Sequence, residues 1–261
     1  SNNRILLGIG SNQKQVVSKK GGKKVAFVVQ DELWYYDYQK SNMYKVFSFE
    51  GEDYRDSRNN YQKHDVQIMK MKSNGDISFV VYGYMNRGKH EGNNGIAVYQ
   101  FSASDQRIEE LAFIPTKIQY DMMKNDIKKG AFLSDDGDFY FYLDGAVYQV
   151  DVESGKSKIL AKNITDDMTV ISDNGMLALN QFKNKIKIID LATQKTDNIS
   201  CGKNEVLRPI GFIGKDFIYG IGEKSEIVRQ KDGSYLYPLT KVFIRSNKKN
   251  VKTYGEDGTY I

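Results

Sequence analysis

The 261-residue sequence is long enough to bury a core of ordinary size, and its 40% hydrophobic and 12% aromatic residues exclude an intrinsically disordered chain. Its 38 Lys and Arg against 33 Asp and Glu give a formal net charge of +5, spread in small groups rather than in the basic stripe of a nucleic-acid-binding surface. Cys201 is the only cysteine, which excludes an intramolecular disulfide and a cysteine-based metal cluster. Because the positive charge forms no basic stripe, we expect no nucleic-acid partner.

The first apolar stretch, NRILLGIG at 3–10, alternates like a strand but has no hairpin mate of its own. We expect Arg4 to Ile9 to pair with a strand from 205–254 and so to close an all-β fold, because closure removes two exposed sheet edges. The sequence opens on Ser1-Asn2, and no run reaches the 18 or so apolar residues of a membrane span. We expect a longer, membrane-anchored parent protein whose anchor lies outside this sequence.

Five hairpin-rich units follow, each made of a turn rich in Asp, Asn, Gly or Lys, and then strands separated by tight turns. They occupy 23–49, 74–114, 136–161, 173–200 and 214–254. A short apolar run precedes each unit, at 15–18, 66–71, 131–133, 168–171 and 206–213. Four strands per unit, repeated about every 40 residues, match the blades of a β-propeller. The prediction is one all-β domain over 1–261, a propeller of about five four-stranded blades.

Two of these units carry a resemblance to a known family. IKIIDLATQKTDNIS at 186–200 and VYQVDVESGKSKILA at 147–161 resemble the third and fourth strands of bacterial WD40-like propeller repeats. The Trp-Asp dipeptide of WD40 repeats is absent, since Trp34 is followed by Tyr35. The resemblance implies the fold and leaves function open, because propellers serve as enzymes, receptors and scaffolds.

Two further segments, at 82–101 and 235–245, are similar to the extracytoplasmic domain of uncharacterised membrane-attached proteins of Gram-positive type. That resemblance implies an extracytoplasmic location at the cell surface, behind a membrane anchor.

The most conspicuous departure from the repeat is GYMNRGKHEGNNG at 83–95. Its glycines and asparagines permit unusual backbone angles, and Asn86, Arg87, His90 and Glu91 give it polar and charged groups, so it is a candidate ligand-binding loop. The alternative is an elaborated surface turn. The histidines show no metal-ligand spacing, and we expect no metal.

A second departure, at 114–130, has apolar residues at helical spacing and predicts a short amphipathic helix near 116–129. Thr116 and Gln119 fit a capping box at its start, Ile118, Met122 and Ile127 fit its apolar face, and Gly130 ends it. We expect it to cover the edge or end of the propeller, or else to bind a partner.

A third departure widens the hairpin of the last unit around Pro238, which is excluded from a central strand. Tyr235 and Tyr237 are candidates for an aromatic ligand platform, and the alternative is cross-strand packing. The acidic turns at 134–138 and 173–175 lack the spacing of calcium loops and predict hairpin turns.

No catalytic residues can be assigned, because the sequence contains no nucleophile elbow, phosphate-binding loop or metalloprotease motif. The sequence favours a monomeric, non-catalytic extracytoplasmic module that binds a protein, peptide or glycan without a cofactor. The alternative is a carbohydrate-active hydrolase or lyase with paired carboxylates in the propeller channel.

Overall fold

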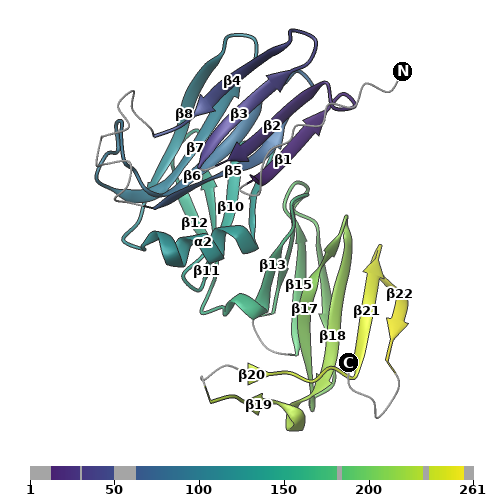
Figure 1. Cartoon of the computed structure of the whole chain (residues 1–261). Coiled ribbons are helices and arrows are strands. Elements are labelled where there is room, and N and C mark those ends of the chain that lie inside the picture. Colours follow the sequence, from purple (N-terminus) through teal and green to yellow (C-terminus); the bar gives the residue numbers. More distant parts are fainter. Residues whose placement is uncertain (1–12, 30, 50–62, 181–183, 232–234, 256–261) are drawn as a thin grey trace. The chain divides into compact units, whose positions relative to one another are not determined.

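A computed structural model describes residues 13–29, 31–49, 63–180, 184–231 and 235–255. Within these ranges the chain is mostly β-strand (Figure 1), with one α-helix, α2 (Tyr120–Lys129), and two short 3-10 turns. The fold is all-β and of the β-propeller class, as the sequence predicted.

In the described part of the chain, five four-stranded sheets follow one another, and each sheet keeps its strands in sequence order. Sheet 1 contains β1 (Gln13–Lys19), β2 (Lys24–Val29), β3 (Glu32–Asp37) and β4 (Asn42–Phe47). Sheet 2 contains β5 (His64–Met71), β6 (Ile77–Tyr84), β7 (Asn94–Ser102) and β8 (Arg107–Pro115). Sheet 3 contains β9 (Ala131–Leu133), β10 (Asp138–Leu143), β11 (Ala146–Asp151) and β12 (Ser157–Lys162).

Sheet 4 contains β13 (Thr169–Ile171), β14 (Met176–Leu179), β15 (Lys185–Asp190) and β16 (Thr196–Ser200). Sheet 5 contains β17 (Glu205–Ile213), β18 (Asp216–Glu223), β21 (Lys241–Ser246) and β22 (Lys249–Tyr254). Between β18 and β21 the chain forms a separate two-stranded hairpin of β19 (Val228–Arg229) and β20 (Tyr235–Leu236).

Burial falls from the second strand of a sheet to the fourth. In β2, β6 and β10 nearly every residue is buried, whichever face of the sheet it occupies. In β4 half of the residues are exposed, in β12 and β16 most are, and in β22 all six are. A strand that is buried on both faces needs a packing partner on each face. A single sheet of this kind therefore cannot bury its own second strand.

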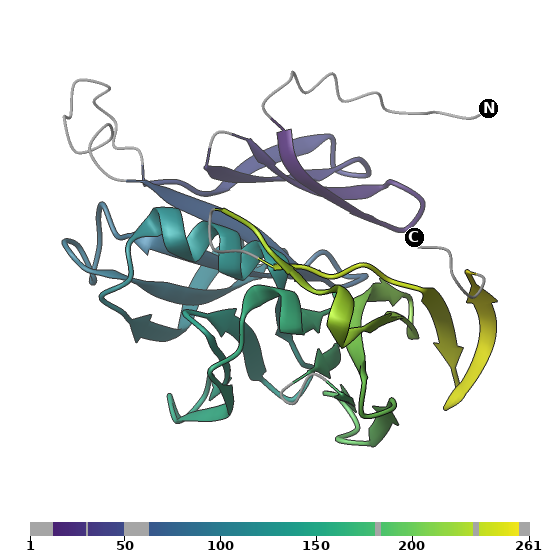
Figure 2. The same cartoon turned by 90° about the horizontal axis from the view of Figure 1, so that it is seen from below.

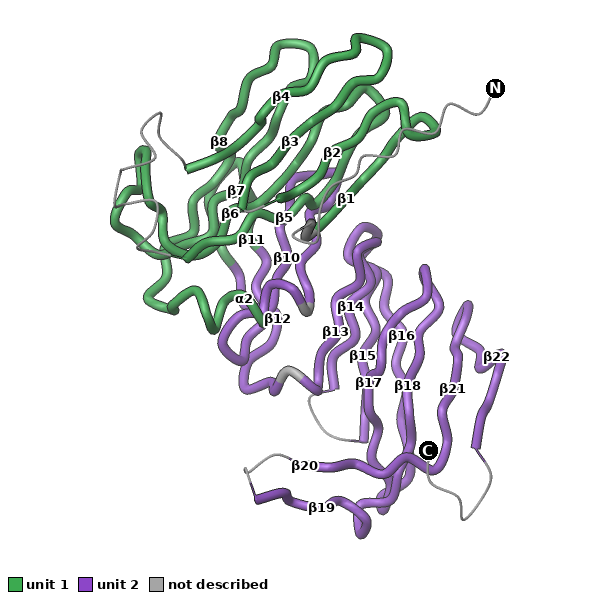
Figure 3. Tube along the Cα trace, in the orientation of Figure 1, with its two compact units in different colours: residues 1–125, 150–157 green, residues 126–149, 158–261 purple. Residues whose placement is uncertain are grey.

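Neighbouring sheets supply that cover within two compact units, residues 1–125 with 150–157 and residues 126–149 with 158–261 (Figure 3). In the first unit, sheets 1 and 2 contribute to one buried cluster, and in the second, sheet 4 shares one cluster with sheet 3 and another with sheet 5. Representative members are Tyr35 with Phe79, Val147 with Leu177, and Ile188 with Phe217.

The predicted first strands of the five units are confirmed as β1, β5, β9, β13 and β17. The predicted closing strand at 4–9 lies outside the described residues, and both it and the single domain over 1–261 stay predictions. None of the helices in the described ranges is both long and apolar enough to cross a bilayer.

The predicted helix exists, but two details of it were wrong. It begins at Tyr120, and Thr116 lies outside it, where the Thr116 hydroxyl accepts the N–H of Ile118 at 3.1 Å. Its buried side chains are Met123 and Ile127, whereas Met122 is 57% exposed. Because Met122 and Met123 are adjacent, sequence spacing alone could not select the buried one.

Candidate functional site

The insert between β6 and β7 is a hydrogen-bonded extension of their hairpin. The N–H of Met85 donates to the carbonyl of Asn93 at 2.9 Å, and the N–H of Gly92 donates back to Met85 at 3.0 Å. At the tip, the N–H of Glu91 donates to the carbonyl of Gly88 at 3.1 Å. Since Met85 is only 1% exposed, the base of the insert is anchored in the core.

His90 fastens the insert to the outer strand of its own sheet. Its ring stacks on Phe113 of β8, with centroids 3.7 Å apart and planes 10° apart, and its Nε2 lies 2.8 Å from Oε1 of Glu110. The same oxygen is 3.5 Å from Nζ of Lys89, and the Tyr99 hydroxyl donates to Oε2 of Glu110 at 3.3 Å. Burial, and then the charge of Glu110, raise the pKa of Tyr99 and keep its hydroxyl protonated.

The other predicted residues of the insert differ in exposure. Asn86 is 2% exposed, Arg87 is half-buried, and Glu91 is exposed. His64 lies in β5, where its ring packs edge-on against Phe49 with centroids 4.6 Å apart. Among the described residues, no group of three or more His, Cys, Asp and Glu side chains is arranged to hold a metal ion.

The two predicted tyrosines have different surroundings. Tyr235 lies in β20 and is 52% exposed, with its ring centroid 6.3 Å from that of Tyr237. Tyr237 is half-buried beneath the guanidinium of Arg208, 4.0 Å from its ring centroid, and Arg208 in turn pairs with Asp167. Tyr237 is therefore engaged by a cation of the protein itself, while about half of Tyr235 is exposed.

Two glycines on β18 let the β20–β21 connection pass across that strand (Figure 2). A Cβ at Gly220 would overlap the Leu239 side chain, and one at Gly222 would overlap the carbonyl oxygen of Pro238. The N–H of Thr240 donates to the carbonyl of Ile221 at 2.8 Å and fixes the crossing. The widening that the sequence predicted around Pro238 thus packs over β18.

Replacing Gly222 with alanine is expected to lower the free energy of unfolding by about 2 kcal/mol, because the Pro238 backbone must move to admit the methyl group. Urea unfolding measures this change. Gly211→Ala is the matched control, since a Cβ at Gly211 meets nothing within 4 Å and should change stability by less than about 0.5 kcal/mol. Equal effects of the two substitutions would contradict the close approach of the connection.

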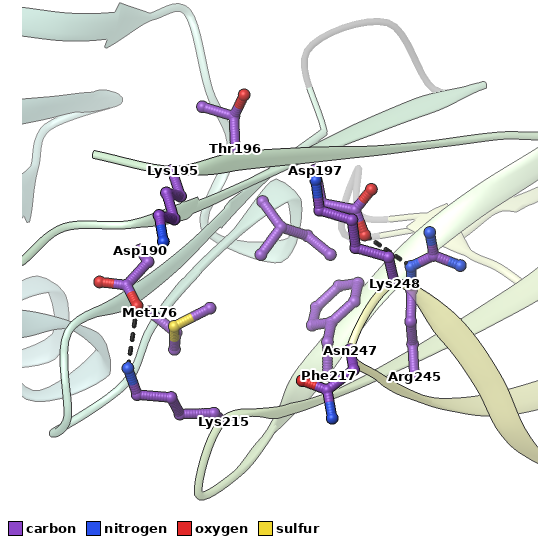
Figure 4. A pocket seen from close by; sticks show the side chains of 11 residues that line it. Met176, Asp190, Lys195, Thr196, Asp197, Lys215, Phe217, Arg245, Asn247 and Lys248 are labelled. Atoms are coloured by element: carbon purple, nitrogen blue, oxygen red, sulfur yellow. Dashed lines mark hydrogen bonds and ion pairs between the residues drawn. The ribbon is translucent and has the colours of Figure 1, made fainter. Parts of the chain in front are cut away.

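A cavity of about 220 Å³ lies between sheets 4 and 5, at the ends of β15, β18 and β21 (Figure 4). Its apolar lining comes from Met176, Ile188 and Phe217. Its polar lining consists of Asp190, Lys195, Thr196, Asp197, Lys215, Arg245, Asn247 and Lys248. Four cations against two carboxylates give the lining a net positive charge.

Both carboxylates of this pocket are paired. Asp190 Oδ2 accepts Lys215 Nζ at 2.9 Å, and Asp197 Oδ2 accepts Arg245 Nε at 2.8 Å. Burial alone would raise the pKa of each aspartate, but the hydrogen bond and charge of its cation, together with backbone hydrogen bonds, outweigh burial and hold the pKa below its ordinary value. Both aspartates are therefore ionised at neutral pH.

The two remaining cations stand on turns with defined backbones. Oδ1 of Asp190 accepts the N–H groups of Ala192 and Thr193 at 3.1 and 3.0 Å, and the Asp190 N–H donates to the carbonyl of Lys195 at 2.9 Å. Lys248 is the second residue of the two-residue turn between β21 and β22, where Asn247 has φ +47° and Lys248 has φ +65°. Neither lysine makes an ion pair or a side-chain hydrogen bond with another described residue.

The sequence did not predict this pocket. It located the hairpins that contain Lys195 and Lys248, but these residues lie 53 positions apart (248 − 195). Their proximity depends on how sheet 5 packs on sheet 4, which periodicity within a strand does not encode. The one local signal was a lysine in a hairpin-turn position that normally favours glycine.

Comparisons with known proteins give likenesses of structure alone. No family model and no curated protein sequence matches the chain. Porphyromonas gingivalis dipeptidyl peptidase 4 has 11% identity and a TM-score of 0.46, over 94% of this chain and 46% of that one, so the chain spans about half of its length. The WD40 domain of fission yeast SCAP has 11% identity and a TM-score of 0.43, over 96% and 78% of the two chains. Oligogalacturonate lyase from Vibrio parahaemolyticus has 8% identity and a TM-score of 0.46, over 88% and 66%.

Proposed function

We propose that the chain is a non-catalytic binding or sensing module that holds its ligand in the pocket between sheets 4 and 5. The observation that carries this proposal is the charge state of the pocket. Lys195 and Lys248 lack ion-pair partners among the described residues, while Asp190 and Asp197 are each neutralised by a cation. Unpaired ammonium groups beside apolar surface suit recognition of an anionic ligand.

The pKa shifts argue against a general-acid role for the two aspartates of this pocket. A general acid needs a carboxyl group whose pKa is raised toward the working pH. The pKa values of Asp190 and Asp197 are both held below the ordinary value. Neither group is thereby prepared to donate a proton near neutral pH.

The same proposal includes the ligand class, the oligomeric state and the location of the module. Its ligand is a protein, peptide or glycan, and the module acts as a monomer outside the cytoplasm, attached to the membrane through the parent protein. Resemblance of 82–101 and 235–245 to membrane-attached proteins supports this location. The insert between β6 and β7 exposes Lys89 and Glu91 on a fastened hairpin and offers a second contact surface.

Peptide and glycan arrays probed with the purified chain test the proposal. Wild-type protein should give signals that fall at least about tenfold when Lys195 and Lys248 are replaced together by Gln and Gly, because two charge-assisted contacts are lost. A matched control replaces Lys158 and Lys162, two exposed lysines of β12 outside the pocket and the insert, by Gln. If every wild-type signal survives the pocket substitutions, the pocket is not the ligand site and the proposal fails.

A further inference from the structure

The unpaired charges of the pocket belong to two separate turns. Lys195 follows Asp190 in the β15–β16 turn, and Lys248 lies near enough to Asp197 to lower the pKa of that aspartate. Figure 4 shows Lys195 on the Asp190 side of the pocket and Lys248 on the Asp197 side. A compact dianion such as phosphate needs its positive charge gathered at one point. Two separate single charges on the ligand match this arrangement better.

The surface between the two lysines is apolar. Phe217 is 2% exposed, Ile188 is 5% exposed, and Met176 is half-buried, so the apolar area still open to a ligand belongs mainly to Met176. An inorganic anion would leave the exposed part of Met176 in contact with water. A ligand with an apolar group between its charges would cover it and gain the free energy of apolar burial.

The size of the cavity limits what can enter. A volume of about 220 Å³ is below the range of about 300–1,000 Å³ for pockets that enclose a drug-sized ligand. The cavity therefore has room for one side chain with its adjoining backbone, and the rest of a longer ligand must lie outside it.

A strand edge adjoins the cavity. Thr196 and Asp197, which line it, belong to β16, and among the described strands β16 is the terminal one in the order of sheet 4. The free side of an edge strand offers N–H and C=O groups to an extended peptide, which is a recurring mode of peptide recognition. A small free acid would make no use of this edge.

We infer that the pocket binds an extended acidic peptide segment, with one apolar side chain on the apolar lining of Met176, Ile188 and Phe217 and a carboxylate on either side paired with Lys195 and Lys248. In an extended peptide, alternate side chains point to the same face, so the matching pattern is acidic-x-apolar-x-acidic. This inference rests on the proposed function and adds the chemical class of the ligand.

The test uses three acetylated, amidated pentapeptides and isothermal titration calorimetry with the whole chain. Glu-Ser-Phe-Ser-Glu carries the full pattern, Gln-Ser-Phe-Ser-Gln lacks the charges, and Glu-Ser-Ser-Ser-Glu lacks the apolar group. The first peptide should bind at least about tenfold more tightly than either of the others. Raising the salt concentration should weaken the first peptide selectively.

Substitutions in the pocket make the test specific to these lysines. Lys248→Gly removes the ammonium and keeps the turn, because glycine adopts the positive φ of this position without strain. Lys195→Gln removes the other ammonium from an exposed turn. Each should weaken the Glu peptide about five- to tenfold and leave the Gln peptide unchanged, and Lys195→Arg should restore the lost affinity. Unchanged thermal melting of each variant establishes that the fold is intact.

Different failures point to different errors. If the Glu and Gln peptides bind equally, or if Lys248→Gly and Lys195→Gln leave the Glu peptide unaffected, the inferred ligand class is wrong. Array ligands that still depend on the two lysines would then preserve the proposed function. If no array ligand and no peptide depends on the lysines, the pocket is not a binding site, and both proposals fail together.

Discussion

Replacing Lys24 with methionine is expected to lower the free energy of unfolding by about 3 kcal/mol, the lower end of the range for breaking a buried ion pair. Lys24 of β2 and Asp37 of β3 are a cross-strand pair, with Nζ 2.7 Å from Oδ2, and they are 8% and 3% exposed. Lys24 also donates to the Tyr35 hydroxyl at 3.0 Å. The single substitution leaves a buried carboxylate without its cation, which accounts for the large loss.

The double variant Lys24→Met with Asp37→Leu is the informative control, because replacing a whole buried pair with apolar residues is often close to neutral. We expect it to recover most of the lost stability in urea unfolding. A double variant as unstable as the single one would show that the loss comes from packing around Lys24 and not from the unpaired charge of Asp37.

The same pair predicts the direction of the pH dependence. Burial acts to raise the pKa of Asp37, but the hydrogen bond and charge of Lys24, together with the backbone N–H groups of Gln39 and Lys40, outweigh it, and the pKa lies below its ordinary value. A depressed carboxyl pKa contributes stability above the unfolded-state value of about 4, and this contribution is lost as the pH falls through the folded-state value. The wild-type protein should therefore lose more stability below about pH 4 than the double variant does, as measured by urea unfolding across the acid range.

Replacing Phe79 with alanine is expected to cost about 4 kcal/mol of unfolding free energy, because a large buried side chain is lost and the cavity closes only in part. Phe79 of β6 is 0% exposed and belongs to the cluster shared by sheets 1 and 2. Its ring stacks on Tyr99, with centroids 5.2 Å apart, and lies 5.7 Å from Phe47 of sheet 1.

Two comparison variants distinguish the loss of a large buried side chain from the effect of substitution in general. Phe79→Leu keeps much of the volume and should cost about 1.5 kcal/mol. Ile159→Ala, at a position 41% exposed in β12, should change the free energy of unfolding by less than about 0.5 kcal/mol. A loss below about 1 kcal/mol for Phe79→Ala would contradict the shared core of sheets 1 and 2.

Sequence periodicity was sufficient to predict the sheets, because each strand is short, is bounded by a turn and pairs with its neighbour in the sequence. The run Ala131 to Leu133 was predicted with its observed bounds. The start of the helix was wrong because Thr116 and Gln119 fit a capping box, while the Thr116 hydroxyl instead closes a turn with Ile118.

The candidate site was less predictable, because it depends on contacts between sheets. Sequence composition drew attention to the insert around His90, and the structure shows that this histidine is stacked on Phe113 and paired with Glu110. The pocket depends on Lys195 and Lys248, which a single sequence presents as two ordinary turn residues. Only the packing of sheet 5 on sheet 4 brings them to one cavity.

The fall in burial from second to fourth strand has a consequence for how this protein can evolve. Substitutions at exposed positions usually change stability by less than about 0.5 kcal/mol, so selection for folding acts weakly on β22 and the other outer strands. Selection acts strongly on β2, β6 and β10, where nearly every side chain is enclosed. Homologues should therefore diverge fastest along their outer strands, and distant ones should be recognisable by three or four enclosed apolar strands at regular spacing, long after overall sequence identity has disappeared.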